Sequence, residues 1–181
     1  KPRQRDELLQ LQHELAAGYG YHSPRFLERD GVEALLDTTR YCAGLLDPRS
    51  GHLHPLNYTL GLARAAVAAG VQVFERSPVT RIERGDPLRL VTPDGAITAR
   101  YAVLTRGGYV AGLHVPADWR VMPVGTYVVA TEPLGEERIT ALIRQNVAVA
   151  DVNFVLDYFR RSADHRLLFG GRVSYSGIDA R

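Results

Sequence analysis

The stretch from residue 51 to residue 83 constrains the fold more strongly than any other part of the sequence. The pair His54-Pro55 is typical of a helix start, because proline at the first helical position gives up only an N–H that has no intrahelical partner. Apolar side chains then recur at helical spacing, at Leu56, Leu60, Ala63 and Val67. Gly70 suits the left-handed residue that often ends a helix. The stretch therefore predicts a helix followed by two short strands, at 71–74 and 79–83, within an α/β fold.

Expected elements cover most of the remaining sequence. We expect helices at 5–17, directly after Ser23-Pro24, at 32–36 and at 136–144, and we expect Asp30-Gly31 to end the second of them. We expect strands at 41–46, 88–92, 96–100, 101–104, 124–131, 147–150, 153–161 and 166–169. Pro93-Asp94-Gly95 predicts a hairpin turn, because proline presets φ and glycine accepts positive φ. A second hairpin is expected about residues 163–165.

Composition excludes several classes of function. The chain has 181 residues, which suffice for one good core or two small ones. A net charge of +2 gives no electrostatic case for a nucleic acid or a membrane surface as partner. No apolar run is long enough to span a bilayer. The single cysteine, Cys42, rules out an internal disulfide framework and fits a reducing compartment, so we expect a cytoplasmic protein.

Two further patterns could carry chemistry but have ordinary interpretations. His52 and His54 would point to one face of an extended segment, yet a zinc site needs three or four ligands, so no metal is expected. His52 is more simply interpreted as ordering the loop beside Pro55 or lining a substrate entrance. Cys42 has no identifiable electropositive partner that would activate it as a nucleophile.

Paired glycines and one polar strand face are the stronger site candidates. Gly107-Gly108 and Gly170-Gly171 each follow an expected strand, where the missing side chains let a ligand or another backbone approach closely. A tight turn is the alternative interpretation of each pair. Tyr158 and Arg160 share one face of their expected strand. That face is either a solvated hairpin surface or a binding surface.

Ordered motifs run through the sequence from about residue 35 to its end. G-H-L-H-P-L-N at 51–57 precedes an alanine-rich helix, and A-G-V-x-V at 69–73 and S-P-V-x-R-I at 77–82 follow it. Further motifs are T-P-D-G at 92–95, M-P-V-G-T at 122–126, A-T-E-P-L at 130–134 and L-L-F-G-G at 167–171. In this order and spacing, the sequence resembles the FAD-dependent amine and amino-acid oxidoreductases of the D-amino-acid oxidase family.

The resemblance implies a fold, a cofactor and a reaction. The fold would be α/β (α+β), a partial FAD-binding layer plus a β-rich substrate layer of a two-domain flavoprotein. Its parts would be a helical N-terminal segment at 1–40, a partial FAD-binding domain at 41–115 and a partial substrate-binding domain at 116–181. The enzyme would oxidise the C–N bond of a small amine or amino acid to an imine by hydride transfer to FAD.

The resemblance also implies residue roles. Val79 would meet the adenine through its backbone, the segment near Thr105 and Gly107 would approach the phosphate and ribityl region, and the pair Gly170-Gly171 would approach the flavin ring. Tyr158 would lie over the flavin and Arg160 would bind a substrate carboxylate, with Tyr127 and His52 as further substrate contacts. Arg106 departs from the small residues or asparagine that relatives carry at its position. No residue stands out as a general base.

The Gly-rich turn G-x-G-x-x-G that this family uses for the cofactor pyrophosphate is not found in the sequence. We therefore interpret the chain as an internal fragment whose partners are the N- and C-terminal parts of the same enzyme, and we expect the fragment alone to be inactive. Two alternatives remain open: a non-catalytic folded fragment, or another α/β nucleotide-binding module that binds no flavin by itself.

Overall fold

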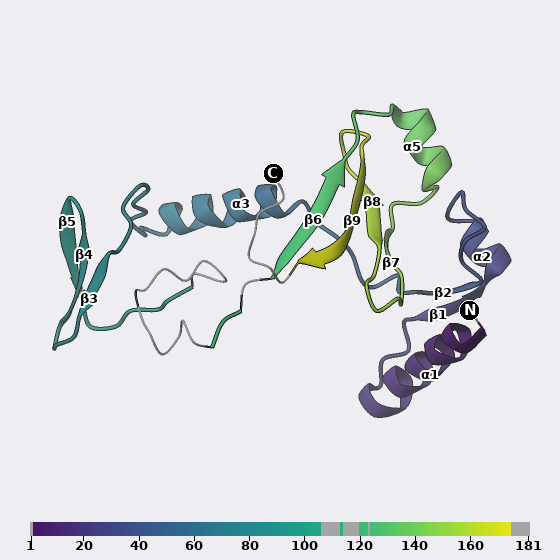
Figure 1. Cartoon of the computed structure of the whole chain (residues 1–181), viewed down its shortest axis with the longest axis horizontal. Coiled ribbons are helices and arrows are strands. Elements are labelled where there is room, and N and C mark those ends of the chain that lie inside the picture. The colour runs from purple at the N-terminus through teal and green to yellow at the C-terminus, as the bar shows by residue number, and fades with distance from the viewer. Residues whose placement is uncertain (1, 106–112, 114–119, 123, 175–181) are drawn as a thin grey trace. The chain divides into compact units, whose positions relative to one another are not determined.

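A computed structural model describes residues 2–105, 113, 120–122 and 124–174. The chain divides into two compact units, whose elements are labelled in Figure 1. Unit 1 comprises Lys1–Pro55 and Thr126–Val173, and unit 2 comprises Leu56–Gly125 and Ser174–Arg181.

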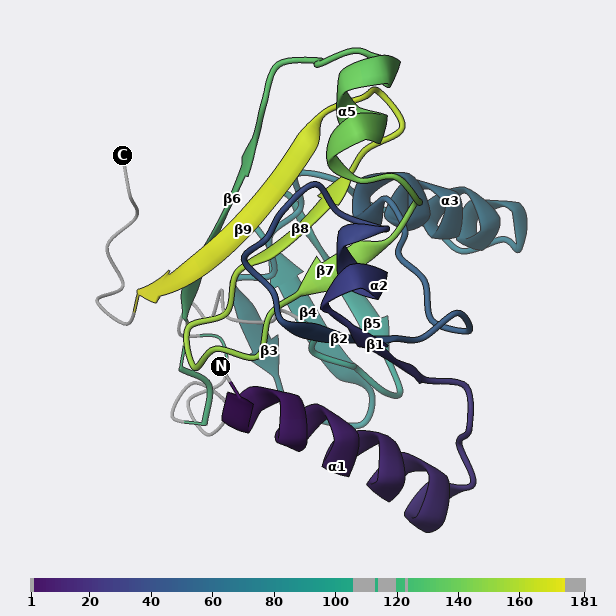
Figure 2. The same ribbon diagram turned by 90° about the vertical axis from the view of Figure 1, so that its right-hand side faces the viewer.

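Unit 1 combines helices with a two-stranded and a four-stranded sheet. In chain order its elements are α1 (Pro2–Tyr19), β1 (Arg25–Glu28), α2 (Arg29–Glu33), β2 (Ala43–Leu46), β6 (Gly125–Ala130), α5 (Glu136–Leu142), β7 (Ala148–Ala150), β8 (Tyr158–Arg161) and β9 (Leu167–Ser174). β1 pairs with β2 in an antiparallel ladder, and the larger sheet has the strand order β6-β9-β8-β7. Helices α2 and α5 lie on the same side of that sheet (Figure 2).

The hydrophobic core of unit 1 joins segments that are far apart in the sequence. Val32, Leu36, Ile139 and Ile143 are its buried residues among those described. The main chain links the two halves directly, because Arg144 N–H donates to the Leu35 carbonyl at 2.8 Å and Asp37 N–H donates to the Leu142 carbonyl at 3.0 Å. The core therefore holds the N-terminal segment against the helix α5 and the sheet that follows it.

One face of the four-stranded sheet packs on this core. Val149, Phe159 and Leu167 pack against it, and the Phe159 ring stacks on the rings of Tyr41 and Phe169, with centroids 6.5 and 6.0 Å away. Alternation along the strands sends the neighbouring side chains to the opposite face. We call that opposite face the Tyr158 face; its residues are Ala148, Ala150, Tyr158, Arg160, Leu168 and Gly170.

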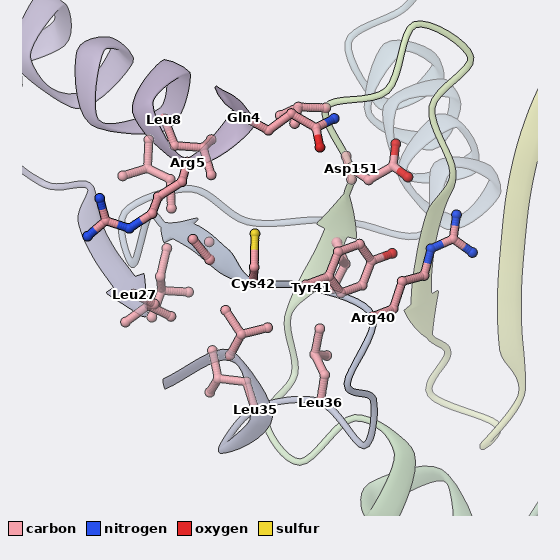
Figure 3. A pocket seen from close by; sticks show the side chains of 18 of the residues that line it. Gln4, Arg5, Leu8, Leu27, Leu35, Leu36, Arg40, Tyr41, Cys42 and Asp151 are labelled. Atoms are coloured by element: carbon pink, nitrogen blue, oxygen red, sulfur yellow. The ribbon is translucent and has the colours of Figure 1, made fainter. Parts of the chain in front are cut away.

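A cavity of about 400 Å³ borders the core of unit 1 (Figure 3). Side chains from α1, β2, α2 and β7 line it, and Cys42 lies among them. The cations of its lining are already paired: the guanidinium of Arg5 donates to Glu28, and that of Arg40 lies 3.1 Å from a carboxylate oxygen of Asp157. The cavity therefore presents mainly apolar groups and no uncompensated guanidinium.

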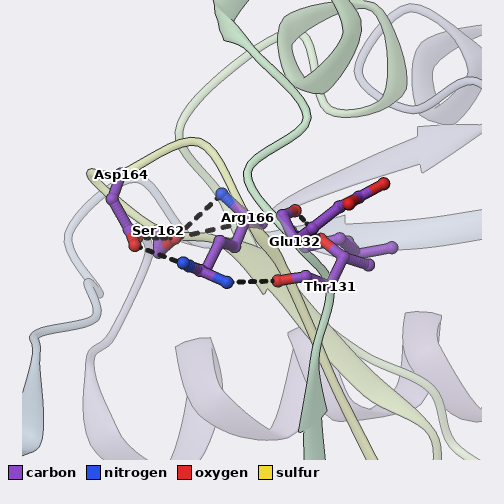
Figure 4. Close-up of polar contacts among 6 residues, drawn as sticks. Thr131, Glu132, Ser162, Asp164 and Arg166 are labelled. Carbon is purple, nitrogen blue, oxygen red and sulfur yellow. Dashed lines mark hydrogen bonds and ion pairs between the residues drawn. The ribbon is translucent and has the colours of Figure 1, made fainter.

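Polar contacts pin the turn between β8 and β9 to the end of β6 (Figure 4). The Arg166 guanidinium donates to the Asp164 carboxylate at 2.7 Å and to the Thr131 carbonyl at 2.7 Å. Thr131 N–H in turn donates to the Leu167 carbonyl at 3.1 Å. The pKa of Asp164 is lowered, first by the hydrogen bond from the Ser162 hydroxyl and then by the one from Arg166. The carboxylate thus keeps its charge and holds the turn closed.

Unit 2 consists of a helix and a three-stranded antiparallel sheet. Its elements are α3 (Pro55–Ala68), β3 (Arg81–Glu83), β4 (Leu88–Thr92) and β5 (Gly95–Ala99), with the strand order β3-β4-β5. The carboxylate of Glu83 accepts hydrogen bonds from Arg89 and Arg81, which lower its pKa in that order. α3 contains no buried residue, so it gains little packing energy within unit 2.

Most of the expected elements are confirmed. The helices at 5–17 and 136–144, the helix beginning at His54-Pro55, the hairpin at 88–100 and the hairpin about residues 163–165 are all present, although the first strand of the last one begins at Tyr158 rather than at 153. The mixture of helices and strands confirms the expected fold class. None of the described helices is long and apolar enough to cross a membrane. The division at residues 40 and 115 into functional domains stays a prediction.

Several local expectations are wrong. The segment after Ser23-Pro24 is the strand β1, because β2 supplies a hydrogen-bonding partner that overrides local helix preference. Asp30-Gly31 does not end a helix but lies within α2. Residues 71–74 and 101–104 form no strand in the described part of the chain, since no described strand lies beside them to complete a ladder.

Candidate functional site

Tyr158 and Arg160 stand side by side on the Tyr158 face of the sheet, as the alternation of β8 predicts. Tyr158 is opposite Ala150 of β7 and Gly170 of β9, and Arg160 is opposite Ala148 and Leu168. Both side chains are half-buried. Because their cross-strand neighbours are small or uncharged, a phenol and a guanidinium are the polar groups that the paired residues of these three strands offer on this face.

The phenol ring of Tyr158 lies against the main chain of β9. A Cβ placed on Gly170 would come within 2.1 Å of Tyr158 Cε2 and 2.6 Å of its hydroxyl oxygen. The expectation that Gly170-Gly171 ends a strand is wrong, because β9 continues to Ser174. The first glycine makes room for Tyr158, and a Cβ on Gly171 would lie 2.9 Å from a carboxylate oxygen of Asp157.

The side chain of Arg160 makes no hydrogen bond or ion pair with any residue in the described part of the chain. Its neighbour Arg161, on the core face, donates to the Thr140 hydroxyl at 3.1 Å. A half-buried guanidinium without a carboxylate partner is suited to a planar anion, which it can bind through two parallel hydrogen bonds. Arg160 is therefore a candidate for binding a carboxylate group of a ligand.

The loop between β7 and β8 holds the start of β8 in place. One carboxylate oxygen of Asp151 accepts hydrogen bonds from the backbone N–H groups of Asn153 and Asp157, both at 3.1 Å. Asp151 N–H also donates to the Asp157 carbonyl at 2.9 Å, and the Asp157 side chain pairs with Arg40 at 3.1 Å. These contacts fix the backbone immediately before Tyr158. The sequence reasoning missed them, although the Asp-x-Asn pattern at 151–153 is a recognisable turn signal.

The other two predicted substrate residues lie elsewhere in unit 1. His52 donates from Nε2 to the Asn146 carbonyl at 3.3 Å, which places its ring just before β7. Tyr127 lies on β6, which β9 separates from β8. The structure therefore brings Tyr158 and Arg160 together and keeps Tyr127 on a strand that is not adjacent to theirs. The substrate roles of all four residues stay predictions.

The predicted cofactor residues are distributed over both units. Val79 lies before β3 and outside any strand, and no hydrogen bond joins its main chain to another residue in the described ranges. Thr105 is exposed and lies outside any strand. Gly107 lies outside the described residues, and Gly170 and Gly171 belong to unit 1. No group of three or more His, Cys, Asp or Glu side chains that could hold a metal occurs among the residues described.

Comparison with known proteins identifies the family. The whole chain, residues 1–181, matches the family described as FAD dependent oxidoreductase, DAO. The chain belongs to this family. This membership contradicts the alternative of an unrelated nucleotide-binding module. FAD is the cofactor of the family.

Three relatives are similar to this chain over most of its length. The protein named probable oxidoreductase OrdL from Haemophilus influenzae is 36% identical over 177 residues, covering 95% of this chain and 41% of that protein. Gamma-glutamylputrescine oxidoreductase from Escherichia coli is 38% identical over 172 residues, covering 94% and 40%. Human mitochondrial dimethylglycine dehydrogenase is 31% identical over 140 residues, covering 75% and 16%. The chain thus spans about two fifths of the first two relatives.

Among the described residues, the main-chain N–H and C=O of Val79 have no hydrogen-bonding partner. The open main chain of Val79 can exchange hydrogen bonds with a heterocyclic base, as its predicted adenine contact requires. On the Tyr158 face, however, the space over Gly170 is filled by the ring of Tyr158. The group that this position presents to a ligand is therefore the phenol, and a direct contact of Gly170 with the cofactor stays a prediction.

Proposed function

We propose that this chain belongs to an FAD-dependent enzyme that oxidises the C–N bond of a small amine carrying a carboxylate, giving an imine. The observation that carries the proposal is that Tyr158 and Arg160 lie on the same face of β8 and that the Arg160 guanidinium binds no carboxylate among the described residues. A site for an amino acid or a similar amine needs such a cation to hold the carboxylate end. The family supplies the oxidoreductase chemistry.

The names of two relatives support the substrate class. They refer to gamma-glutamylputrescine and to dimethylglycine, and each of these molecules contains both an amine nitrogen and a carboxylate. On β8, the guanidinium of Arg160 can bind the carboxylate of such a molecule, and the ring of Tyr158, two residues away, can lie beside its amine end. In the proposal Arg160 anchors the carboxylate and Tyr158 lines the space beside the reacting carbon. His52 and Tyr127 are assigned to the outer parts of the substrate site.

The chemistry that FAD supplies when bound is acceptance of a hydride equivalent from the carbon next to the substrate nitrogen. The resemblance to the family assigns Val79, Thr105, Gly107, Gly170 and Gly171 to its binding, and we keep that assignment as part of the proposal. The contribution of this chain is to bind and orient the amine and to exclude water from it. We assign no general base.

The proposal places this chain within a longer enzyme. The first two relatives are about two and a half times as long as the part that matches it, from the shares of 41% and 40%. The exposed apolar residues of α3, such as Leu56, Leu60 and Val67, support this placement, because contiguous apolar surface is usually covered by further protein. The N- and C-terminal parts of the same enzyme are the proposed cover.

Anaerobic mixing of the full-length enzyme with candidate substrates tests the function. Amines that carry a carboxylate should bleach the visible absorbance of the bound flavin, and hydrolysis of the imine should release an aldehyde or keto product with ammonia or an amine. The matched control is the hydroxy acid in which a hydroxyl replaces the amine. Bleaching by the hydroxy acid but not by the amine would contradict the proposal.

A further inference from the structure

Gly170 lies inside β9 and directly opposite Tyr158 of β8. A Cβ on Gly170 would come within 2.1 Å of Tyr158 Cε2, 2.2 Å of Cζ and 2.6 Å of the hydroxyl oxygen. These separations are far shorter than any van der Waals contact, so the hydroxyl end of the ring lies directly over the β9 main chain. Gly170 is consequently buried, whereas Ala148 and Ala150 on the same face are exposed.

Contacts of the preceding residue fix the backbone that carries Tyr158. The Asp151 carboxylate binds Asp157 N–H at 3.1 Å, and the Asp157 side chain is paired with Arg40. On the β7 side the cross-strand neighbour of Tyr158 is Ala150, which carries a methyl group. The ring therefore lies over the one cross-strand neighbour that has no side chain.

We infer that Gly170 is a positioning residue, which seats the ring of Tyr158 across β9 and thereby sets where its hydroxyl lies on the Tyr158 face. An alanine at this position would occupy the space of the ring and force it to turn off the strand. The effect on folding follows from the packing alone. The effect on catalysis rests on the proposed function, in which Tyr158 borders the substrate; there, a displacement of about 1 Å can cost about 100-fold in rate.

A double-mutant cycle in the full-length enzyme tests the inference. The variants are Gly170→Ala, Tyr158→Ala and the two combined, with the melting temperature and kcat/KM measured for each. The matched control is Gly18→Ala in α1, where an added Cβ meets no atom within 4 Å. The melting temperature is a readout that does not depend on amine turnover.

Gly170→Ala alone should lower the melting temperature of the full-length enzyme by about 1–5 °C, the range that overpacking gives in a protein of more than about 400 residues. It should also lower kcat/KM at least about tenfold through misplacement of the phenol. In the Tyr158→Ala background the same alanine has room, so the melting temperature should stay level or rise, because alanine restricts the unfolded chain more than glycine does. In that background kcat/KM should change less than about twofold.

An equal loss of melting temperature in both backgrounds overturns the inference, since Gly170 would then be needed for another contact. An unchanged melting temperature for Gly170→Ala overturns it as well. If Gly170→Ala cannot be purified, recovery of folded protein in the double variant supports the inference, and failure of the double variant overturns it. If Tyr158→Ala leaves kcat/KM unchanged while the melting temperatures of the cycle are as expected, the role of Gly170 in positioning the ring is supported. The proposed placement of Tyr158 in the substrate site is then rejected.

Discussion

Replacing Arg160 by alanine in the full-length enzyme should raise KM for a carboxylated amine much more than it lowers kcat. A hydrogen bond to a charged group contributes about 1.5–3 kcal/mol, which corresponds to about 10- to 150-fold in affinity. Arg160 is half-buried, so solvent screens part of this interaction and we expect the lower end, about 10- to 30-fold in KM. Because the carboxylate is held equally in the ground state and the transition state, kcat should change less than about threefold.

The assay compares a carboxylated amine with the analogue in which hydrogen replaces the carboxylate. Arg160→Ala should raise KM for the first and leave KM for the second within about twofold, since only the first offers an anion. Arg161→Ala is the matched control, because Arg161 is the next residue but lies on the core face and binds Thr140. Equal effects of Arg160→Ala on both amines, or unchanged kinetics, would refute the assignment. The melting temperature of Arg160→Ala should move by no more than about 2 °C, since the side chain makes no described polar contact.

Three further predictions concern the cofactor, the loop after β2 and the core. The 181-residue chain expressed alone should purify without flavin, because its sequence has no Gly-rich turn for the pyrophosphate; a yellow preparation with stoichiometric FAD contradicts this. The hydroxyls of Ser50, Tyr21 and Ser23 hold the pKa of Asp47 far below its usual range, so its charge stabilises the fold above the unfolded value near 4. Asp47→Asn should therefore lower the melting temperature at pH 7 and lose that effect as the pH falls below about 4; a deficit that is the same at pH 7 and at pH 2 argues against this account. Phe159 is half-buried, so Phe159→Ala should cost less than the roughly 3–5 kcal/mol of a fully buried phenylalanine, about 2–3 kcal/mol or roughly 5–10 °C in a chain of this length. Phe154→Ala, at a fully exposed ring, should cost less than about 0.5 kcal/mol, and equal losses would refute the stacking argument.

The candidate site could be predicted in part, because some of its geometry depends only on residues that are neighbours in the sequence. The alternation of a strand is enough to put Tyr158 and Arg160 on one face, and β8 confirms that arrangement. The sequence predicts a close approach at the glycine pair 170–171, but the approaching group is a tyrosine on the neighbouring strand. The identity of that group depends on strand register, which the local pattern does not contain.

The same division holds for the fold. The sequence by itself determined α1, α3, α5 and the hairpin turns, because helix periodicity, caps and turn residues act over a few neighbouring positions. It also determined the family, because the order and spacing of the motifs can be recognised without knowing which residues are in contact. Only the tertiary structure decided that residues 25–28 form a strand, that Tyr41 stacks on Phe159 and that Leu36 meets Ile143. These pairings join segments about 20 to more than 100 residues apart, where the free energy comes from shared burial and ladder hydrogen bonds rather than from the preference of any one residue.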